Sequence, residues 1–347
     1  MPQARTGAAI VKAIVTGGAG FIGSHLVDLL VDRGFEVTVI DDMSTGRPDN
    51  LARHRSNPRV RLHDADAVTL DPLSPLFAHT DYVFHLAGRG DIVPSIERPL
   101  DYMRVNVTGT LAALEAARAA GVRKFVYAAS SSCYGSHPPV PTAEDAPIGP
   151  EYPYALSKYL GECAVLHWNR VYSLPVVSVR IFNAYGPRVR TRGAYGAVFG
   201  VFLAQKLNRR PFTVVGDGSQ RRDFVYVSDV ARAFLLAAES SCSGEIFNLG
   251  AGNPQSVNRL VELLGGDVVH VPKRPGEPDC TWADTRKIRD ELGWAPEVTF
   301  EEGVARMLQT IDQWADAPVW TPESIRAATA TWFEYLGRRP ATGGETA

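Results

Sequence analysis

Residues 16–23 read Thr16-Gly17-Gly18-Ala19-Gly20-Phe21-Ile22-Gly23, between an apolar, β-branched run at 9–15 and an apolar helical pattern. Glycines at every third position allow a tight turn and let the backbone approach a pyrophosphate closely. The helix that follows offers free N–H groups and a partial positive charge to the same anion. The context therefore predicts dinucleotide binding, with an ordinary glycine-rich turn as the alternative. The residues expected to contact the dinucleotide here are Gly17, Gly20, Phe21, Ile22 and Gly23.

The second apolar run ends in two carboxylates, Asp41 and Asp42. A carboxylate at this strand end can accept hydrogen bonds from the adenosine ribose and would repel a 2′-phosphate, which favours NAD over NADP. Arg47 is close enough in sequence to keep NADP open. After the third run, Asp64 and its neighbour Ala65 are expected near the adenine, although a solvated strand-end carboxylate is an equal alternative.

Strand-like and helical segments alternate through the first half of the chain. Further apolar runs at 60–62, 82–86, 125–129 and 176–181 are separated by helical patterns that include 105–119 and 154–171. This alternation predicts an α/β fold, a Rossmann-type doubly wound parallel sheet, with a smaller C-terminal substrate-binding region. The expected divisions are an NAD-binding core at 9–185, a mainly substrate-binding region at 186–336 that partly returns to the core, and a disordered tail at 337–347.

The composition argues against several classes of partner. The chain of 347 residues has 36 basic and 38 acidic side chains, so its formal net charge of −2 gives no electrostatic case for nucleic acid or an anionic membrane. No apolar run approaches the ~20 residues that a membrane span needs. The four cysteines form no Cys-x-x-Cys pair, so we expect reduced thiols in a soluble cytoplasmic protein. We expect no bound metal.

Tyr154 and Lys158 stand about one helical turn apart, so their side chains point from the same helix face. An ammonium beside a phenol favours the phenolate, so the pKa of Tyr154 is expected to fall from ~10 towards neutrality. Tyr154 would then act as a general base. Taken alone, this spacing is more often a packed tyrosine with a solvated lysine, and it is the upstream glycine turn that favours catalysis.

Several other motifs follow one another in order along the chain. They are His85-Leu86-Ala87-Gly88, Val105-Asn106-Val107-Thr108-Gly109-Thr110, Ser130-Ser131-Ser132-Cys133-Tyr134-Gly135, Tyr154 to Lys158, Arg180 to Pro187, Arg222 to Val227, and Arg274-Pro275-Gly276-Glu277-Pro278. With them the chain resembles the extended short-chain dehydrogenase/reductases, specifically the NAD-dependent nucleotide-sugar epimerase/dehydratase family and its UDP-glucose 4-epimerase-like members. The matches run from Thr16 to about Trp294.

The resemblance implies catalytic and cofactor-binding roles. Tyr154 would take a proton from a sugar hydroxyl while the carbon gives hydride to NAD. Lys158 would hold the nicotinamide ribose, and Ser130 would hydrogen-bond the reacting oxygen, with Ser131 or Ser132 able to share that task. The residues expected along the cofactor are Ala87, Gly88 and Arg89, with Asn106 acting indirectly or serving as a helix-start cap instead.

The resemblance also implies how a nucleotide sugar would bind. Asn183 matches a substrate-contacting asparagine, and Arg222 and Arg274 match arginines that grip the diphosphate, a task suited to guanidinium donors. Surface arginines are the alternative. Ser131 and Ser132 are expected to face the sugar. Thr281 occupies a position in the sugar-pocket wall where a tyrosine would exclude N-acetylhexosamines, so we expect N-acetyl sugars to be tolerated.

Epimerisation at C4 is the reaction favoured by the sequence. Dehydratases and decarboxylating relatives place acidic residues after the catalytic Ser/Thr, where this chain has Ser131 and Ser132, which are poor acids and bases. Cys133 is interpreted as a packed thiol. The arginine-rich segment 188–192 suits either a uronic acid substrate or a solvated basic loop. A reductase, a dehydratase and a non-catalytic NAD-binding regulator remain the alternatives.

Two features concern assembly and the end of the chain. The resemblance implies a homodimer joined through helices that begin near Asp101 and Tyr154. Apolar residues compatible with that interface, or with burial inside the monomer, are Leu111, Leu114, Leu160, Val165 and Leu166. The segment 315–335 extends beyond the resemblance, and its helix either covers the active site or assists assembly.

Overall fold

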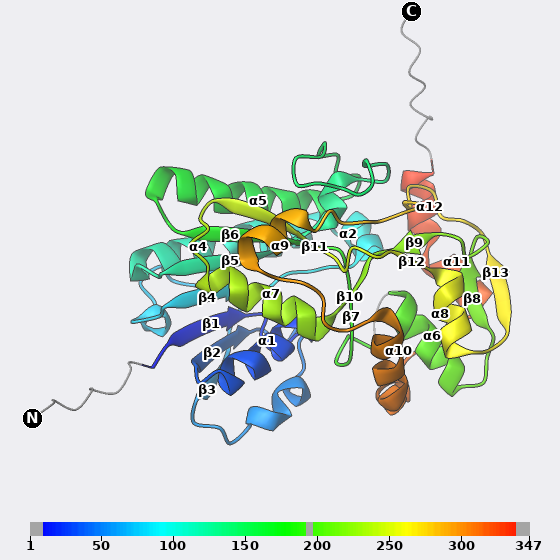
Figure 1. The fold of residues 1–347 in the computed structure, drawn as a ribbon, viewed down its shortest axis with the longest axis horizontal. Helices are drawn as coiled ribbons and strands as arrows, with labels where there is room; N and C mark the ends of the chain where they lie inside the picture. Colours follow the sequence, from blue (N-terminus) through cyan, green and yellow to red (C-terminus); the bar gives the residue numbers. More distant parts are fainter. Residues whose placement is uncertain (1–9, 192–196, 338–347) are drawn as a thin grey trace, which may run out of the picture.

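The computed structural model describes residues 10–191 and 197–337. A parallel sheet forms the centre of the molecule, in the strand order β11-β6-β5-β4-β1-β2-β3 (Figure 1). Its strands are β1 (Lys12–Thr16), β2 (Glu36–Asp41), β3 (Val60–Asp64), β4 (Tyr82–His85), β5 (Lys124–Ser130), β6 (Val176–Ile181) and β11 (Glu245–Leu249). The order runs outward in both directions from β1, which confirms the expected doubly wound Rossmann-type sheet.

Helices cover both faces of this sheet (Figure 1). One face is packed by α1 and α7, whose Leu26, Leu30 and Phe234 are fully buried. The other is packed by α4 and α5 through residues that include Leu114 and Val165. A parallel sheet needs such double cover, because its central strands are apolar on both sides. The helices are α1 (Phe21–Asp32), α2 (Ile92–Glu97), α3 (Pro99–Met103), α4 (Gly109–Ala120), α5 (Pro153–Tyr172), α6 (Val198–Leu207), α7 (Val227–Glu239), α8 (Val257–Leu264), α9 (Arg286–Leu292), α10 (Phe300–Gln309), α11 (Pro322–Ala328) and α12 (Ala330–Leu336).

The part of the chain after β6 forms a second core. Three small sheets pair β7 with β10, β9 with β12 and β8 with β13. An aromatic cluster packs β7, β8 and β10 against α6 and α10. In that cluster the rings of Tyr185 and Phe199 stack 4.5 Å apart. Strand β11 leaves this part and pairs with β6 in the central sheet. The strands are β7 (Asn183–Tyr185), β8 (Phe212–Val215), β9 (Arg221–Arg222), β10 (Phe224–Tyr226), β12 (Gln255–Ser256) and β13 (Val268–Val271).

Three sequence expectations need revision or fall outside the described residues. The helix expected at 105–119 is instead α3, one π-helical turn over Arg104–Thr108, and then α4. The buried side chain of Asn106 bonds to a neighbouring loop from inside that turn, so Asn106 is not a helix-start cap. Ala9, Arg192 and the tail at 338–347 lie outside the described residues.

Candidate active site

The glycine turn leaves no room for side chains. Gly17 has φ +70°, and its N–H donates to Ile40 O at 2.8 Å. A Cβ on Gly17 would lie 2.7 Å from Ala87 N, and one on Gly23 would lie 2.2 Å from Gly17 O. Helix α1 follows, and among the described residues no side chain hydrogen-bonds to its N-cap position. This cradle and helix terminus fit the pyrophosphate of a dinucleotide.

Asp41 closes the far side of the glycine turn. Its carboxylate is buried and accepts hydrogen bonds from Ala19 N at 2.9 Å and Met43 N at 3.0 Å. Burial raises the pKa of Asp41 despite these bonds. A carboxylate has about four acceptor positions, so Asp41 retains capacity for ribose hydroxyls. Asp64 ends β3 directly beside Asp41 in register and is exposed, and Ala65 N donates to Asp41 O at 3.2 Å.

Other candidate cofactor residues meet through Asn106. Its Oδ1 accepts from Arg89 N at 2.8 Å, while its Nδ2 donates to Arg89 O at 3.0 Å and to Ser157 Oγ at 2.8 Å. The loop after β4 is thereby tied to helix α5. A Cβ on Gly88 would lie 3.8 Å from Lys158 Nζ, so this loop borders the lysine. Asp42 lies apart from this group, and its Oδ1 accepts from Ser44 N and Oγ.

Ser130 and Tyr154 are brought into direct contact. Ser130 ends β5, Tyr154 lies in the first turn of α5, and the Tyr154 hydroxyl donates to Ser130 Oγ at 3.2 Å. Ser130 Oγ also accepts from Ser132 N at 3.2 Å and lies 2.8 Å from Ser132 Oγ. Ser132 therefore shares this hydroxyl cluster, whereas Ser131 has no side-chain hydrogen bond of its own in the hydrogen bonds described.

Burial dominates the ionisation of the two residues on α5. It lowers the pKa of Lys158 to about 7, partly offset by the charge of Glu162. The Lys158 ammonium lies 4.3 Å from the centroid of the Tyr127 ring. Burial also raises the pKa of Tyr154, although its bond to Ser130 works in the opposite direction. The expectation of a Tyr154 pKa near neutrality is therefore wrong for the chain alone, because desolvation of the buried phenol outweighs its hydrogen bond to Ser130.

Two candidate diphosphate ligands share one carboxylate. Arg222 Nη2 lies 2.9 Å from Glu277 Oε1, and Arg274 Nε lies 2.9 Å from Glu277 Oε2. Both arginine side chains are largely buried. Glu277 also borders a hollow of about 320 Å³ whose lining includes Val215, Asp217, Gln220 and Lys273. The arrangement concentrates two guanidinium groups around one carboxylate, where an anion can be gripped bidentately.

The remaining candidate substrate residues also contact each other. Thr281 Oγ1 donates to Asn183 Oδ1 at 2.7 Å and accepts from Asp223 N at 3.1 Å. This pair links the strand that carries Asn183 to the segment after Glu277. Cys133 is 2% exposed, and burial raises the pKa of its thiol to about 12, as expected of a packed thiol.

The arginine-rich segment is paired with acidic groups of the core. Arg188 Nη2 lies 2.7 Å from Asp28 Oδ2, and Arg190 Nη2 lies 2.7 Å from Asp91 Oδ2. Asp91 in turn contributes to the raised pKa of Tyr154, so this second pair lies near the candidate base. The third arginine, Arg192, is outside the described residues.

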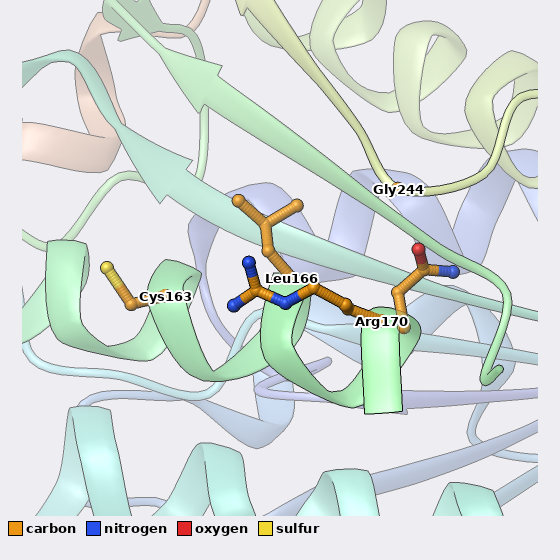
Figure 2. Close-up of a pocket in the computed structure, with 5 residues that line it drawn as sticks. Cys163, Leu166, Arg170 and Gly244 are labelled. Carbon is orange, nitrogen blue, oxygen red and sulfur yellow. The ribbon is translucent and has the colours of Figure 1, made fainter. Parts of the chain in front are cut away.

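A separate hollow lies between α5 and the segment that carries Gly244, and it shares no residue with the group around Tyr154 (Figure 2). Its lining residues are Cys163, Leu166, Asn169, Arg170 and Gly244. Cys163 is already about 13 Å along the helix from Tyr154 at 1.5 Å per residue.

Within residues 10–191 and 197–337 no cluster of three metal-ligating side chains occurs. No helix in that part of the chain is both long and apolar enough to cross a bilayer.

Comparison with known proteins identifies the family. The model of the NAD dependent epimerase/dehydratase family matches residues 13–250. The chain belongs to this family. A UDP-glucose 4-epimerase of Mycolicibacterium smegmatis is 38% identical over 309 residues, covering 86% of this chain and 98% of that protein. NAD is thus the cofactor that the glycine cradle is built for, and the family resemblance seen in the motifs is confirmed.

Solved structures of family members superpose over most of the chain. A UDP-N-acetylglucosamine 4-epimerase from Methanobrevibacter ruminantium, in complex with UDP-N-acetylmuramic acid, has a TM-score of 0.83 and 32% identity, covering 88% of this chain and 100% of that one. A UDP-glucuronic acid 4-epimerase from Bacillus cereus, with UDP-glucuronic acid and NAD, has a TM-score of 0.81 and 30% identity, covering 87% and 99%. These relatives differ in their sugars while sharing the fold.

Sequence reasoning gave no role to three residues that the structure places beside the candidates. Glu277 belongs to the motif Arg274 to Pro278, which was the available signal, and the structure adds that it pairs with both Arg222 and Arg274. Tyr152 stacks on Tyr154, with ring centroids 6.3 Å apart and planes 15° apart. Trp332 lies against Tyr152 and Arg274 from the far end of the chain, and nothing in its local sequence pointed there.

Proposed function

We propose that this family member is an NAD-dependent nucleotide-sugar 4-epimerase that acts on UDP-hexoses, including N-acetylated ones, through a transient 4-keto sugar. The observation that carries the proposal is the hydrogen bond from Tyr154 to Ser130 beside the buried Lys158. A non-catalytic NAD-binding regulator would need the glycine cradle but not the hydrogen-bonded hydroxyls of Tyr154 and Ser130. These hydroxyls therefore favour a catalytic function. The family match to residues 13–250 supports the cofactor assignment.

The proposed chemistry needs a proton acceptor at the 4-hydroxyl of the sugar. Tyr154 removes that proton, and Ser130, already hydrogen-bonded to Tyr154, steadies the same sugar oxygen. Lys158 borders Gly88 and holds the nicotinamide ribose, and its positive charge beside bound cofactor favours the phenolate of Tyr154. NAD, held by the glycine turn and Lys158, would supply the hydride acceptor for C4 and the hydride donor for the opposite face of the ketone. Tyr154 then gives the proton back.

Epimerisation is favoured over dehydration by the groups around Ser130. Elimination of water from a 4-keto sugar needs an acid and a base beside the neighbouring carbon. The positions after Ser130 hold Ser131 and Ser132, and Ser132 Oγ lies 2.8 Å from Ser130 Oγ. A hydroxyl in this position can orient the sugar but is a poor proton donor for a departing hydroxyl group. The buried thiol of Cys133, with its pKa raised to about 12, is a poor base.

Tolerance of N-acetyl sugars is proposed from Thr281. Its side chain is small and is held by Asn183, at 2.7 Å, so the wall it contributes to is short and fixed. The relative solved with UDP-N-acetylmuramic acid is a UDP-N-acetylglucosamine 4-epimerase, and it aligns with 88% of this chain. Arg222 and Arg274 would hold the diphosphate whether or not the sugar is N-acetylated.

UDP-glucuronate is the second candidate substrate, on one specific observation. Arg190 reaches the neighbourhood of Tyr154 through its pair with Asp91, at 2.7 Å. A sugar carboxylate could replace Asp91 as the partner of Arg190. Because Arg190 is already paired, a neutral hexose needs no such exchange, which makes the UDP-hexose assignment the primary one.

A homodimer through α4 and α5 is also proposed, on a corrected set of residues. Leu114 and Val165 are fully buried in the monomer core, so they are not available to a partner. Helix α5 nevertheless exposes Leu156 and Leu160, one turn apart, at 38% and 39%. Adjacent exposed apolar side chains on one helix are typical of an interface. Sedimentation of Leu160→Glu against the parent tests this: a shift to monomer supports it, and an unchanged mass contradicts it.

The function is tested by proton NMR of the purified protein with UDP-glucose, UDP-N-acetylglucosamine and UDP-glucuronate, without added cofactor. A product of unchanged mass with an inverted C4 coupling pattern is expected from the first two. Turnover of UDP-glucuronate alone would move the assignment to the second candidate. A dehydrated or keto product would contradict epimerisation, and binding without turnover of any nucleotide sugar would favour a regulator.

A further inference from the structure

The end of the chain returns to the candidate active site. Helix α12 packs against α2 (Figure 1), and its Trp332 lies against the segment that carries Arg274. Trp332, in the first turn of α12, is only 6% exposed. Its indole Nε1 donates to Pro275 O at 2.6 Å, and its ring centroid lies 5.4 Å from the Arg274 guanidinium.

Trp332 also lies beside the aromatic residues next to the candidate base. Its ring lies 6.4 Å from that of Tyr152, which stacks on Tyr154. Its neighbour Thr331 donates to Glu97 Oε1 of α2 at 3.3 Å. One indole therefore bridges an arginine expected to bind the diphosphate and the aromatic pair that contains the candidate base.

The segment around Arg274 has little structure of its own. Residues 272–280 form no helix, and Gly276 has φ +70°. Ser136 Oγ donates to Gly276 O at 2.7 Å, which ties the segment to the core from one side. The bond from Trp332 to Pro275 ties it from the other. On such a segment, these two backbone contacts fix the position of the Arg274 guanidinium together with its ion pair to Glu277, at 2.9 Å.

We propose that Trp332 is a positioning residue that holds Arg274 in place for the diphosphate of the nucleotide sugar. This rests on the proposed function for its substrate class. The ring presents its face to the guanidinium, a contact that orders the group without consuming its hydrogen-bond donors. The indole N–H fixes the backbone beside it. Since Trp332 touches neither sugar nor NAD in this account, it acts on binding and leaves the chemical step to Tyr154.

The test is a double-mutant cycle in the NAD-bound, full-length protein. UDP is titrated calorimetrically into the parent, Trp332→Ala, Arg274→Ala and the double variant, and KM and kcat are measured with UDP-glucose. Trp332→Ala is expected to raise the Kd for UDP and the KM roughly tenfold, the loss of one such contact, with kcat within about twofold. In the Arg274→Ala background the same change should have almost no further effect, because its target is absent.

Two further variants separate positioning from folding. Trp332→Phe keeps a ring for Arg274 but loses the bond to Pro275, so it should recover part of the UDP affinity. Phe333→Ala alters the next residue of the same helix, which is 39% exposed, and should leave UDP affinity unchanged. Additive losses in the double variant, or UDP binding unaffected by Trp332→Ala, would overturn the inference. A parent that binds no UDP would instead overturn the proposed function.

Discussion

The cofactor side of the site is shaped by backbone, whereas the nucleotide-sugar side is shaped by side chains that hold one another. Around Gly17 and Gly23, the missing Cβ atoms create the cradle, and Asp41 is fixed by main-chain N–H groups. On the other side, Arg222 and Arg274 depend on a shared Glu277. Backbone cradles leave a spacing signature in the sequence, while shared partners arise only when distant segments meet. Substitutions on the cofactor side should therefore cause large losses of stability and cofactor binding, whereas substitutions on the nucleotide-sugar side should lower affinity or turnover by degrees.

The largest effect is expected at the point where the two sides meet. Tyr154→Phe removes the hydroxyl that donates to Ser130, and kcat should fall by roughly 10²–10⁴, the usual contribution of a general base. Binding of NAD and UDP should change little. Tyr172→Phe, on the same helix and 48% exposed, is the matched control. Steady-state kinetics with UDP-glucose measure both, and retained turnover in Tyr154→Phe would remove Tyr154 from the mechanism.

Substitution of Gly23 should disrupt the cofactor-binding turn most directly. In Gly23→Ala the new Cβ would lie 2.2 Å from Gly17 O, so the turn must shift. We expect the free energy of unfolding to fall by about 1–3 kcal/mol, typical of overpacking, together with loss of co-purified NAD.

Gly200→Ala provides the control for that change. A Cβ on Gly200, within α6, would meet Trp314 Nε1 at 3.6 Å, an ordinary contact, so stability and NAD content should be kept. Urea unfolding and the absorbance of released cofactor report on both variants. Equal behaviour of Gly23→Ala and Gly200→Ala would contradict a backbone-shaped cradle.

The buried Lys158 should make the stability of the cofactor side depend on pH. Burial lowers the pKa of Lys158 from 10.5 to about 7, so between pH 7 and 10.5 the unfolded chain binds more protons than the folded one. Stability contributed by this residue therefore rises with pH in that window, by up to about 1.4 kcal/mol per pH unit. In cofactor-stripped protein, the parent should gain about 2 kcal/mol relative to Lys158→Met between pH 7 and 9. Parallel unfolding curves for the two proteins would contradict a buried amine.

A graded effect is expected on the substrate side. Thr281→Tyr enlarges the wall beside Asn183 and removes the bond between them, at 2.7 Å. Turnover of UDP-N-acetylglucosamine should fall about tenfold more than that of UDP-glucose, comparable to the discrimination that pocket size usually provides. The ratio of kcat/KM values for the two sugars measures this. An equal loss on both sugars would mean that Thr281 supports the pocket without selecting the sugar.

The sequence predicted the parts of the site that local motifs define, and missed those that depend on contacts between distant segments. The glycine turn, Ser130, Tyr154 and Lys158 were predicted because local spacing and motif order record them. The structure places Ser130 against Tyr154, with Lys158 four residues further along α5. Trp332 was not found, because its contact with Pro275 joins residues 57 apart and depends on where α12 packs.

The periodicity of apolar residues could not distinguish burial inside the monomer from burial against a second subunit. It indicated that one face of α4 and of α5 is buried, but not against what. Leu114 and Val165 proved to fill the monomer core, while Leu160 on the same helix as Val165 stays 39% exposed. The pKa of Tyr154 was misjudged for a related reason, since a helix-turn argument includes the nearby lysine and omits the desolvation that only packing reveals.

The central claim is that one NAD, held in the backbone cradle, accepts and returns the same hydrogen while Tyr154 moves the proton. UDP-glucose carrying deuterium at C4 tests it most directly, in ordinary water and without added cofactor. The account predicts that the C4-inverted product retains the deuterium at C4, as read by NMR and mass. An inverted product whose label has been lost to solvent would contradict it.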